Sequence, residues 1–188
     1  MRLAILADIH GNDIAFEAAV NDAITQGVDQ LVCLGDVVAL GQQPRQVLER
    51  LQALQIPTVM GNTDDWLLNP QPWEIVEQPG QDLEEARRML AIELWSAAQL
   101  TDADRELIRT FPSTLTINLS DQETLLCFHG SPRHYSDLIR ATTPEEQLDE
   151  WFAGQRATVL AGGHTHTALL RRYQDMLLTI PVAWGFPI

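Results

Sequence analysis

Five short apolar runs in this sequence each end in a cluster of polar residues. The clusters are Asp8-Ile-His10-Gly-Asn12, Gly35-Asp36, Gly61-Asn62-Thr-Asp64, His129-Gly130 and Gly163-His164-Thr-His166. They supply carboxylate, imidazole and amide groups, which bind metal ions and transfer protons. A single histidine or a single Gly-Asp pair is usually structural, but four of the five histidines fall in these clusters. Their joint pattern therefore predicts a metal site.

The clusters should meet at one place, because side chains that follow the carboxyl ends of strands gather at one edge of an α/β sheet. Seven of the residues are candidate ligands: Asp8, His10, Asp36, Asn62, His129, His164 and His166. Nitrogen and oxygen donors without thiolate suit Mn²⁺, Fe or Zn²⁺ better than Ca²⁺. Seven ligands are too many for one tetrahedral ion, but with a bridging carboxylate they serve two ions about 3.5 to 4 Å apart.

The elements that must position these residues alternate in the first half of the chain. We expect strands at 2–7, 31–34 and 56–60, a helix capped by Asn12 or Asp13 and closed by Gly27, and a helix from Pro44. This β-α-β-α-β order predicts parallel strands joined by right-handed crossovers.

The middle of the chain interrupts that order. Residues 66–111 should form a helical insertion in a single domain spanning 1–188, with an irregular Pro-rich start and helices at 82–99 and 101–110. We expect Trp66, Trp73 and Trp95 to be packing residues, with a base-stacking platform as the alternative. Beyond it we predict hairpins at 114–128 and 168–179, a helix at 144–152 and a strand at 158–161. Mixed sheets covered by helices follow from this order.

Composition excludes several classes of function. The net charge is −14, and all twelve basic residues are Arg. Without Lys there is no Walker phosphate lysine and no Schiff-base lysine. The acidic excess argues against binding extended nucleic acid, although metal ions could still bring a small phosphate ester to the site.

Hydropathy and cysteine usage predict the compartment. No apolar run reaches the length of a membrane span, so we expect no membrane partner. Cys33 and Cys127 lie in apolar runs and should be buried thiols in a reducing cytoplasm, with a disulfide or a redox role as the alternative.

The ordered motifs resemble the calcineurin-like metallophosphoesterase superfamily over nearly the whole chain. The segments Ala7-Asp-Ile-His-Gly-Asn12 and His129-Gly-Ser-Pro132 are similar to its bacterial branch of small, Icc-type phosphoesterases. The resemblance implies an α/β fold, a four-layer α-β-β-α sandwich with two mixed β-sheets.

The resemblance also implies how the ligands divide. One metal ion would be held by Asp8, His10, Asp36 and His166, and the other by Asp36, Asn62, His129 and His164, with Asp36 bridging. Two divalent ions are expected, Mn²⁺ first and Fe, Zn²⁺ or Ni²⁺ as alternatives. Asp36, Asn62, His129 and Asp64 would form the catalytic site, where a hydroxide activated by both ions attacks phosphorus in line.

The sequence departs from the family pattern at three places, and the first two affect the choice of substrate. Thr63 stands where many relatives have a histidine that assists the leaving group, so Asp64 loses its imidazole partner and should keep a hydrogen-bonding role. We therefore expect aryl phosphodiesters to be preferred over alkyl monoesters. No Arg follows Asp36, which makes phosphoproteins poor candidates. Arg45 or Arg133 could contact the phosphate, or could simply be solvated.

The third departure lies at 180–188, where relatives continue into further strands. An open sheet edge there would favour a homo-oligomer. The leading hypothesis is hydrolysis of a small phosphodiester. A nucleotide substrate, cyclic or dinucleoside, with 66–111 as its wall, is a second hypothesis. A metal-binding scaffold or interaction module without catalysis is a third.

Overall fold

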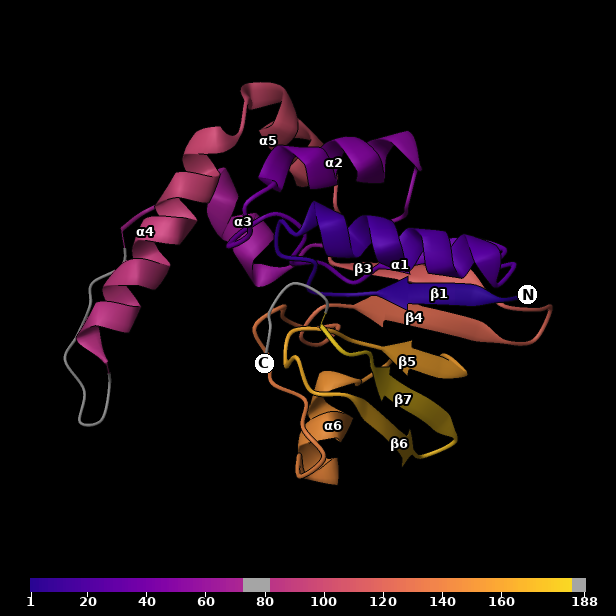
Figure 1. Cartoon of the computed structure of the whole chain (residues 1–188). Helices are drawn as coiled ribbons and strands as arrows, with labels where there is room; N and C mark the ends of the chain where they lie inside the picture. Colours follow the sequence, from indigo (N-terminus) through magenta and orange to yellow (C-terminus); the bar gives the residue numbers. More distant parts are fainter. Residues whose placement is uncertain (73–81, 184–188) are drawn as a thin grey trace.

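The computed structural model describes residues 1–72 and 82–183 of the chain. In this part of the chain, two β-sheets stack face to face, with helices on the outer face of each (Figure 1). The order of the elements follows the sequence prediction closely, apart from one helix and one strand.

The smaller sheet pairs β1 (Leu3–Leu6) with β2 (Gln30–Cys33) in parallel, and Leu3 lies opposite Gln30. Helices α1 (Asp13–Thr25) and α2 (Pro44–Ala53) cover its outer face. Asn12 caps α1 as predicted, because its side-chain oxygen accepts a hydrogen bond from the backbone N–H of Ala15 at 3.0 Å.

The strand predicted at 56–60 is reduced to one bridge, between Cys33 and Thr58. The backbone N–H of Cys33 donates to Pro57 O at 2.9 Å, and that of Val59 donates to Cys33 O at 3.0 Å. Pro57 itself has no N–H to donate, and Met60 donates instead to Pro112 O at 2.8 Å. The segment is extended, but it forms no continuous ladder.

The larger sheet is mixed and has the order β3-β4-β5-β7-β6. Its strands are β3 (Thr114–Asn118), β4 (Thr124–Phe128), β5 (Val159–Ala161), β6 (Leu169–Tyr173) and β7 (Met176–Ile180). Strands β4, β5 and β7 run parallel, and β3/β4 and β6/β7 are the two predicted antiparallel hairpins. Helix α6 (Glu145–Trp151) packs on the outer face, as predicted.

Three buried clusters hold the layers together and confirm the four-layer α-β-β-α arrangement. The prediction of two mixed sheets is wrong for the smaller sheet, because its ladder among the described residues, β1 with β2, is parallel. The cluster between the sheets contains Ala7, Val32, Leu34, Val59, Ile117, Leu125, Cys127 and Ala161. A second cluster lies under α1 and α2, and a third lies under α6. Cys33 and Cys127 are free and fully buried, which confirms the expected burial.

The described part of the segment predicted as an insertion, 66–111, holds two complete helices and the end of a third. Helices α4 (Leu83–Gln99) and α5 (Asp102–Arg109) match the prediction, and Asp82 and Thr101 cap them. Helix α3 (Asn62–Leu68) was not predicted, and it begins inside one of the polar clusters. Helix α4 extends away from the two sheets (Figure 1).

The predicted packing role of the tryptophans holds only in part. Trp66 packs against the cluster under α1 and α2, but Trp95 is 44% exposed. Trp73 and Pro79 lie outside the described residues. None of the helices described has the length and apolar character needed to span a membrane. Strand β6 lies at an edge of the larger sheet, and its Leu170 is 72% exposed. Self-association through this edge stays a prediction.

Candidate metal centre

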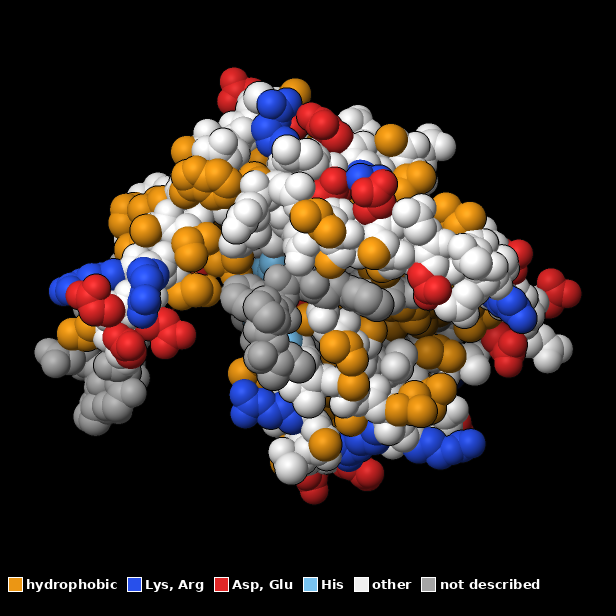
Figure 2. Space-filling view, in the orientation of Figure 1, with side chains coloured by type: hydrophobic (Ala, Val, Ile, Leu, Met, Phe, Trp, Pro, Cys, Tyr) orange, Lys and Arg blue, Asp and Glu red, His pale blue; other side chains and the backbone are white. Residues whose placement is uncertain are grey.

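The loops at the carboxyl ends of the strands bring all seven candidate ligands together. Asp8 and His10 follow β1, Asp36 follows β2, His129 follows β4, and His164 and His166 follow β5. Asn62 begins α3 beside them. Among the described residues, the potential ligand atoms form two groups, Asp8-His10-His166 and Asp36-His129-His164, with all atoms of a group within 4.8 Å of one another. Histidine atoms reach the surface in a hollow on the face shown in Figure 2.

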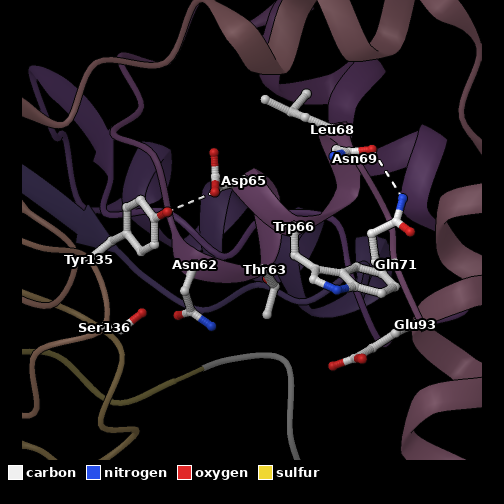
Figure 3. Close-up of a pocket in the computed structure, with 10 residues that line it drawn as sticks. All are labelled: Asn62, Thr63, Asp65, Trp66, Leu68, Asn69, Gln71, Glu93, Tyr135 and Ser136. Atoms are coloured by element: carbon white, nitrogen blue, oxygen red, sulfur yellow. Dashed lines mark hydrogen bonds between the residues drawn. The ribbon is translucent and has the colours of Figure 1, made fainter. Parts of the chain in front are cut away.

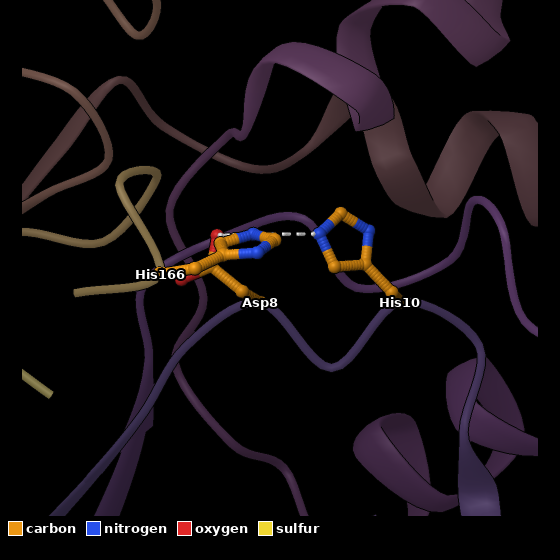
Figure 4. Close-up of side chains that lie close together, drawn as sticks. All are labelled: Asp8, His10 and His166. Carbon is orange, nitrogen blue, oxygen red and sulfur yellow. Dashed lines mark hydrogen bonds and ion pairs between the residues drawn. The ribbon is translucent and has the colours of Figure 1, made fainter. Parts of the chain in front are cut away.

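The first group brings His166, from the loop after β5, next to Asp8 and His10, from the loop after β1 (Figure 4). His166 Nε2 lies 3.4 Å from Asp8 Oδ1 and 3.1 Å from His10 Nε2. The carboxylate of Asp8 is fully buried and also accepts a hydrogen bond from the backbone N–H of His164 at 3.1 Å. This hydrogen bond fixes the second histidine loop relative to the first strand.

The second group is organised by His129. Its Nδ1 lies 2.6 Å from the carbonyl oxygen of Leu34, which leaves Nε2 directed at Asp36 Oδ2, 3.3 Å away. The side-chain amide of Asn62 lies 3.0 Å from the same Nε2. The Leu34 carbonyl therefore selects the tautomer whose free nitrogen faces the site.

Asp36 connects the two groups. Its Oδ2 lies 3.3 Å from His129 Nε2 and 3.8 Å from His10 Nε2, while Oδ1 accepts the backbone N–H of Thr63 at 2.9 Å. One oxygen thus faces an imidazole of each group, and the other anchors the carboxylate to α3. A carboxylate in this position can be shared by two cations.

Burial and charge determine the protonation of the site. Burial alone would raise the pKa of Asp36, but the charge of His129 and its hydrogen bond outweigh burial and hold that pKa well below its usual range. Burial opposes the charged form of His129 in the same way, yet the charge of Asp36 raises its pKa to about 9. Burial dominates at His10 and His164 and lowers the pKa of both. Neutral imidazole is the form that binds metal, so a cation bound at His129 would have to displace the proton on Nε2.

The backbone of the site is unusual. Asp8, His10, Asp36, His164 and His166 all adopt the left-handed conformation, with φ between 47° and 69°. This conformation is uncommon outside glycine, although Asp and His tolerate it better than most residues. Backbone strain of this kind is typically concentrated at functional sites.

Glycine is required where two of these loops touch. A Cβ on Gly61 would lie 2.2 Å from Asp36 Oδ1, which is far inside van der Waals contact. Gly35 has φ +91°, and a Cβ there would lie 2.7 Å from the backbone nitrogen of Gly61. The Gly-Asp and Gly-Asn pairs therefore let two backbones meet behind the candidate ligands.

Asp64 is fully buried behind the ligands and belongs to neither group. Its Oδ1 accepts the backbone N–H of Val37 at 3.0 Å, and its Oδ2 accepts that of Gly61 at 3.3 Å. Burial, and then the charge of Asp36, raise its pKa to about 7. Asp64 thus holds the loops that carry Asp36 and Asn62, in keeping with the predicted hydrogen-bonding role.

The two arginines proposed as phosphate contacts interact with acidic residues instead. Arg45 lies 3.2 Å from Asp104, and Arg133 pairs with Glu150 and lies 3.8 Å from Asp137. The structure therefore favours their solvated, surface role.

A cavity of about 590 Å³ opens beside the candidate ligands. Its ten lining residues are Asn62, Thr63, Asp65, Trp66, Leu68, Asn69, Gln71, Glu93, Tyr135 and Ser136 (Figure 3). They come from α3 and the residues just after it, from α4 and from the loop after β4. The hydroxyl of Tyr135 donates to Asp65 Oδ2 at 2.7 Å and links that loop to α3. Only Asn62 belongs both to the cavity and to the candidate ligands.

Comparison with known proteins identifies the family. A family model described as a calcineurin-like phosphoesterase superfamily domain matches residues 1–185. The chain belongs to the calcineurin-like phosphoesterase superfamily. The resemblance predicted from the five motifs is therefore correct. This family binds divalent metals, and the donors gathered here fit such ions, since they combine carboxylate oxygen with imidazole nitrogen and lack thiolate.

Individual relatives of this phosphoesterase-family chain are distant. An uncharacterised protein of Methanocaldococcus jannaschii is 24% identical over 176 residues, which cover 94% of this chain and 67% of that protein. The crystal structure of a metallophosphoesterase from Sphaerobacter thermophilus has a TM-score of 0.73 at 23% identity, covering 100% of this chain and 78% of that one. Vacuolar Protein Sorting 29 from Cryptosporidium parvum has a TM-score of 0.56 at 16% identity, covering 97% and 74%. These structures share the fold.

Proposed function

We propose that this protein is a divalent-metal-dependent phosphoesterase that hydrolyses a small phosphodiester. The observation that carries the proposal is the pair of donor groups that face one another across Asp36. Family membership supports phosphoester hydrolysis, and a site with two cations suits in-line displacement at phosphorus. Mn²⁺ is the ion we expect, with Fe, Zn²⁺ or Ni²⁺ as alternatives.

Asp8, His10, Asp36 and His166 would hold one cation, and Asp36, Asn62, His129 and His164 the other. Bound cations would supply a nucleophilic oxygen at neutral pH and neutralise the phosphoryl charge. The protein's own part is to hold these donors in place. The Leu34 carbonyl orients His129, and the N–H of Thr63 orients Asp36. Asp64 anchors the loops that carry Asp36 and Asn62.

Thr63 shapes the choice of substrate. It occupies the position between Asn62 and Asp64, and its hydroxyl has no hydrogen-bond partner among the described residues. A threonine hydroxyl cannot act as a general acid near neutral pH, and such an acid contributes about 10² to 10⁴ in rate. The leaving group must therefore depart without a proton from this position, which favours phosphodiesters with aryl or other acidic leaving groups.

The test is hydrolysis of bis(p-nitrophenyl) phosphate with Mn²⁺, together with calorimetric measurement of Mn²⁺ binding. Asp36→Asn should lose most of the turnover and weaken metal binding, because it removes the carboxylate common to both groups. His129→Ala should act in the same direction. Asp121→Asn, in an exposed hairpin turn, is the matched control and should behave as wild type. Wild-type turnover that is independent of metal would refute the proposal.

A metal-binding protein without catalysis is the second candidate, because the sorting protein from Cryptosporidium has the same fold. The complete set of seven donors favours the enzyme, since a scaffold needs no such set. The two candidates differ in one outcome. Saturable Mn²⁺ binding without turnover of any phosphomonoester or phosphodiester would favour the scaffold.

A further inference from the structure

We infer that the cavity beside Asn62 selects the substrate, and that it takes an uncharged aromatic substituent of the ester, such as a nucleoside, and rejects a chain of further phosphates. This inference rests on the proposed function, because it assumes that the reacting phosphate lies at the candidate metal centre. It concerns residues that take no part in holding the metals.

The position of the cavity determines what enters it. Asn62 lies at its edge and is also a candidate metal ligand, and Thr63 and Trp66 follow on the same helix. Figure 3 shows the side chain of Thr63 between those of Asn62 and Trp66. A phosphate held at the metals would therefore place one ester substituent in the cavity, beyond Asn62. A volume of about 590 Å³ lies within the usual range for small-molecule sites.

The cavity offers an aromatic surface. Trp66 is only partly buried, and its indole lines the cavity. Tyr135 lines the cavity from the loop after β4, and its hydroxyl is held by Asp65. Stacking on such rings favours planar aromatic groups, and the side-chain amides of Asn69 and Gln71 add donors and acceptors for the polar edge of such a group.

The charge of the cavity argues against phosphates. Asp65 and Glu93 are acidic, and none of the ten residues that line the cavity in the described part of the chain is basic. A nucleoside triphosphate bound by its terminal phosphate would have to run its other phosphates past Asn62 into this acidic space. Charges of the same sign a few ångströms apart repel, and the protein as a whole carries a charge of −14.

The acidic lining of the cavity distinguishes between two kinds of nucleotide substrate that the metal centre alone would accept. An aryl ester of a nucleoside monophosphate has a single phosphate and an acidic leaving group, so its uncharged nucleoside can occupy the cavity. A dinucleoside polyphosphate places a charged chain there. The inferred substrate class is therefore a phosphodiester of one nucleoside, without a polyphosphate chain.

Binding is the direct test of the aromatic surface. The dissociation constants of thymidine 5′-monophosphate and ethyl phosphate are measured by calorimetry at a fixed free Mn²⁺ concentration. Trp66→Leu should weaken binding of the thymidine nucleotide about 5- to 150-fold, the range for losing one stacking partner, and should leave ethyl phosphate and Mn²⁺ binding unchanged. Trp66→Phe should restore most of the loss. Trp95→Leu is the matched control, because Trp95 lies outside this cavity.

The charge argument has its own pair of variants. Asp65→Asn with Glu93→Gln should improve binding of thymidine 5′-triphosphate relative to the monophosphate by about 3- to 10-fold, because two like charges are removed. Glu84→Gln with Glu85→Gln removes the same charge from α4 outside the cavity and should leave the ratio unchanged. Both dissociation constants in each ratio are measured on the same variant at the same Mn²⁺ concentration. A change in the stability of the variant therefore affects both constants and leaves their ratio unchanged.

The outcomes separate this inference from the proposed function. Metal-dependent turnover with equal affinity for thymidine 5′-monophosphate in wild type and Trp66→Leu would overturn the inference alone. A triphosphate that binds wild type as tightly as the monophosphate would do the same. Absence of turnover would overturn the proposed function, while the binding ratios would still decide what the cavity takes.

Discussion

Replacement of Asp64 by alanine should destabilise the protein more than any change to its exposed neighbour Asp65. Asp64 is fully buried, and its two oxygens accept the backbone N–H groups of Val37 and Gly61. Alanine leaves both donors unsatisfied in the interior of the protein. Each such loss costs about 1–3 kcal/mol.

Two contributions of opposite sign determine the magnitude. The lost hydrogen bonds together cost about 2–6 kcal/mol. Removal of the carboxyl also relieves its desolvation, which is the main reason that its pKa is raised to about 7. The net cost should therefore lie in the lower part of the range, about 2–4 kcal/mol. A protein of 150–250 residues loses about 2–4 °C of Tm per kcal/mol, so the expected fall is about 4–16 °C.

The assay is thermal unfolding followed by circular dichroism, with calorimetric Mn²⁺ binding on the same samples. Metal affinity should fall about 10- to 100-fold, because the loops that carry Asp36 and Asn62 lose their common anchor. Asp64→Asn keeps one acceptor and should fall between wild type and alanine. Asp65→Ala loses only a hydrogen bond from Tyr135, so its Tm should change little. If Asp64→Ala melts within 2 °C of Asp65→Ala, Asp64 does not hold these loops.

Three further predictions follow from named side chains. Thr63→His should raise turnover of alkyl esters by up to about 10² to 10⁴, while Thr63→Val should not, as measured by phosphate release with Mn²⁺; equal rates for both variants would contradict the role assigned to this position. The thiols of Cys33 and Cys127 should stay unreactive toward Ellman's reagent until the protein unfolds, because burial raises the pKa of both, to about 12 for Cys127. Asp104→Asn should lower stability at pH 7: burial opposes the charged form, but hydrogen bonds from Thr101 and the charge of Arg45 lower the pKa of Asp104 overall. A carboxyl group with a lowered pKa stabilises the folded state at pH values above its ordinary pKa of about 4. The difference in free energy of unfolding between wild type and Asp104→Asn, measured by urea titration, should therefore shrink as the pH falls below that value. A difference that stays constant with pH would contradict this prediction.

Much of the fold could be predicted because local patterns and packing agree. The helical spacing of Val47, Leu48 and Leu51 predicted α2, and all three side chains are buried. Helix α3 was missed because it has seven residues and starts with Asn62, Thr63, Asp64 and Asp65, which favour turns. Too few turns are present for helical periodicity to show.

The residues of the candidate metal centre could be predicted from the sequence, but their arrangement in space could not. All candidate ligands except Asn62 follow a strand, and that rule alone brings Asp8, Asp36 and His129 together. The left-handed backbone at Asp8 and Asp36 and the close approach of Gly35 to Gly61 lie where loops contact one another, which no local pattern encodes. The cavity lined by Trp66, Glu93 and Tyr135 joins three distant parts of the chain, so only tertiary packing reveals it.

The left-handed backbone of five ligands has a consequence for engineering and for evolution. Positions of this kind suit glycine and asparagine, so Asp and His there carry a backbone strain of up to about 1–3 kcal/mol each. Replacing His164 or His166 by glycine would remove a donor while relaxing its loop. Without selection for metal binding, substitutions at these positions would therefore tend to increase stability and remove ligand side chains. The protein is less stable at each of these positions because it keeps a donor there.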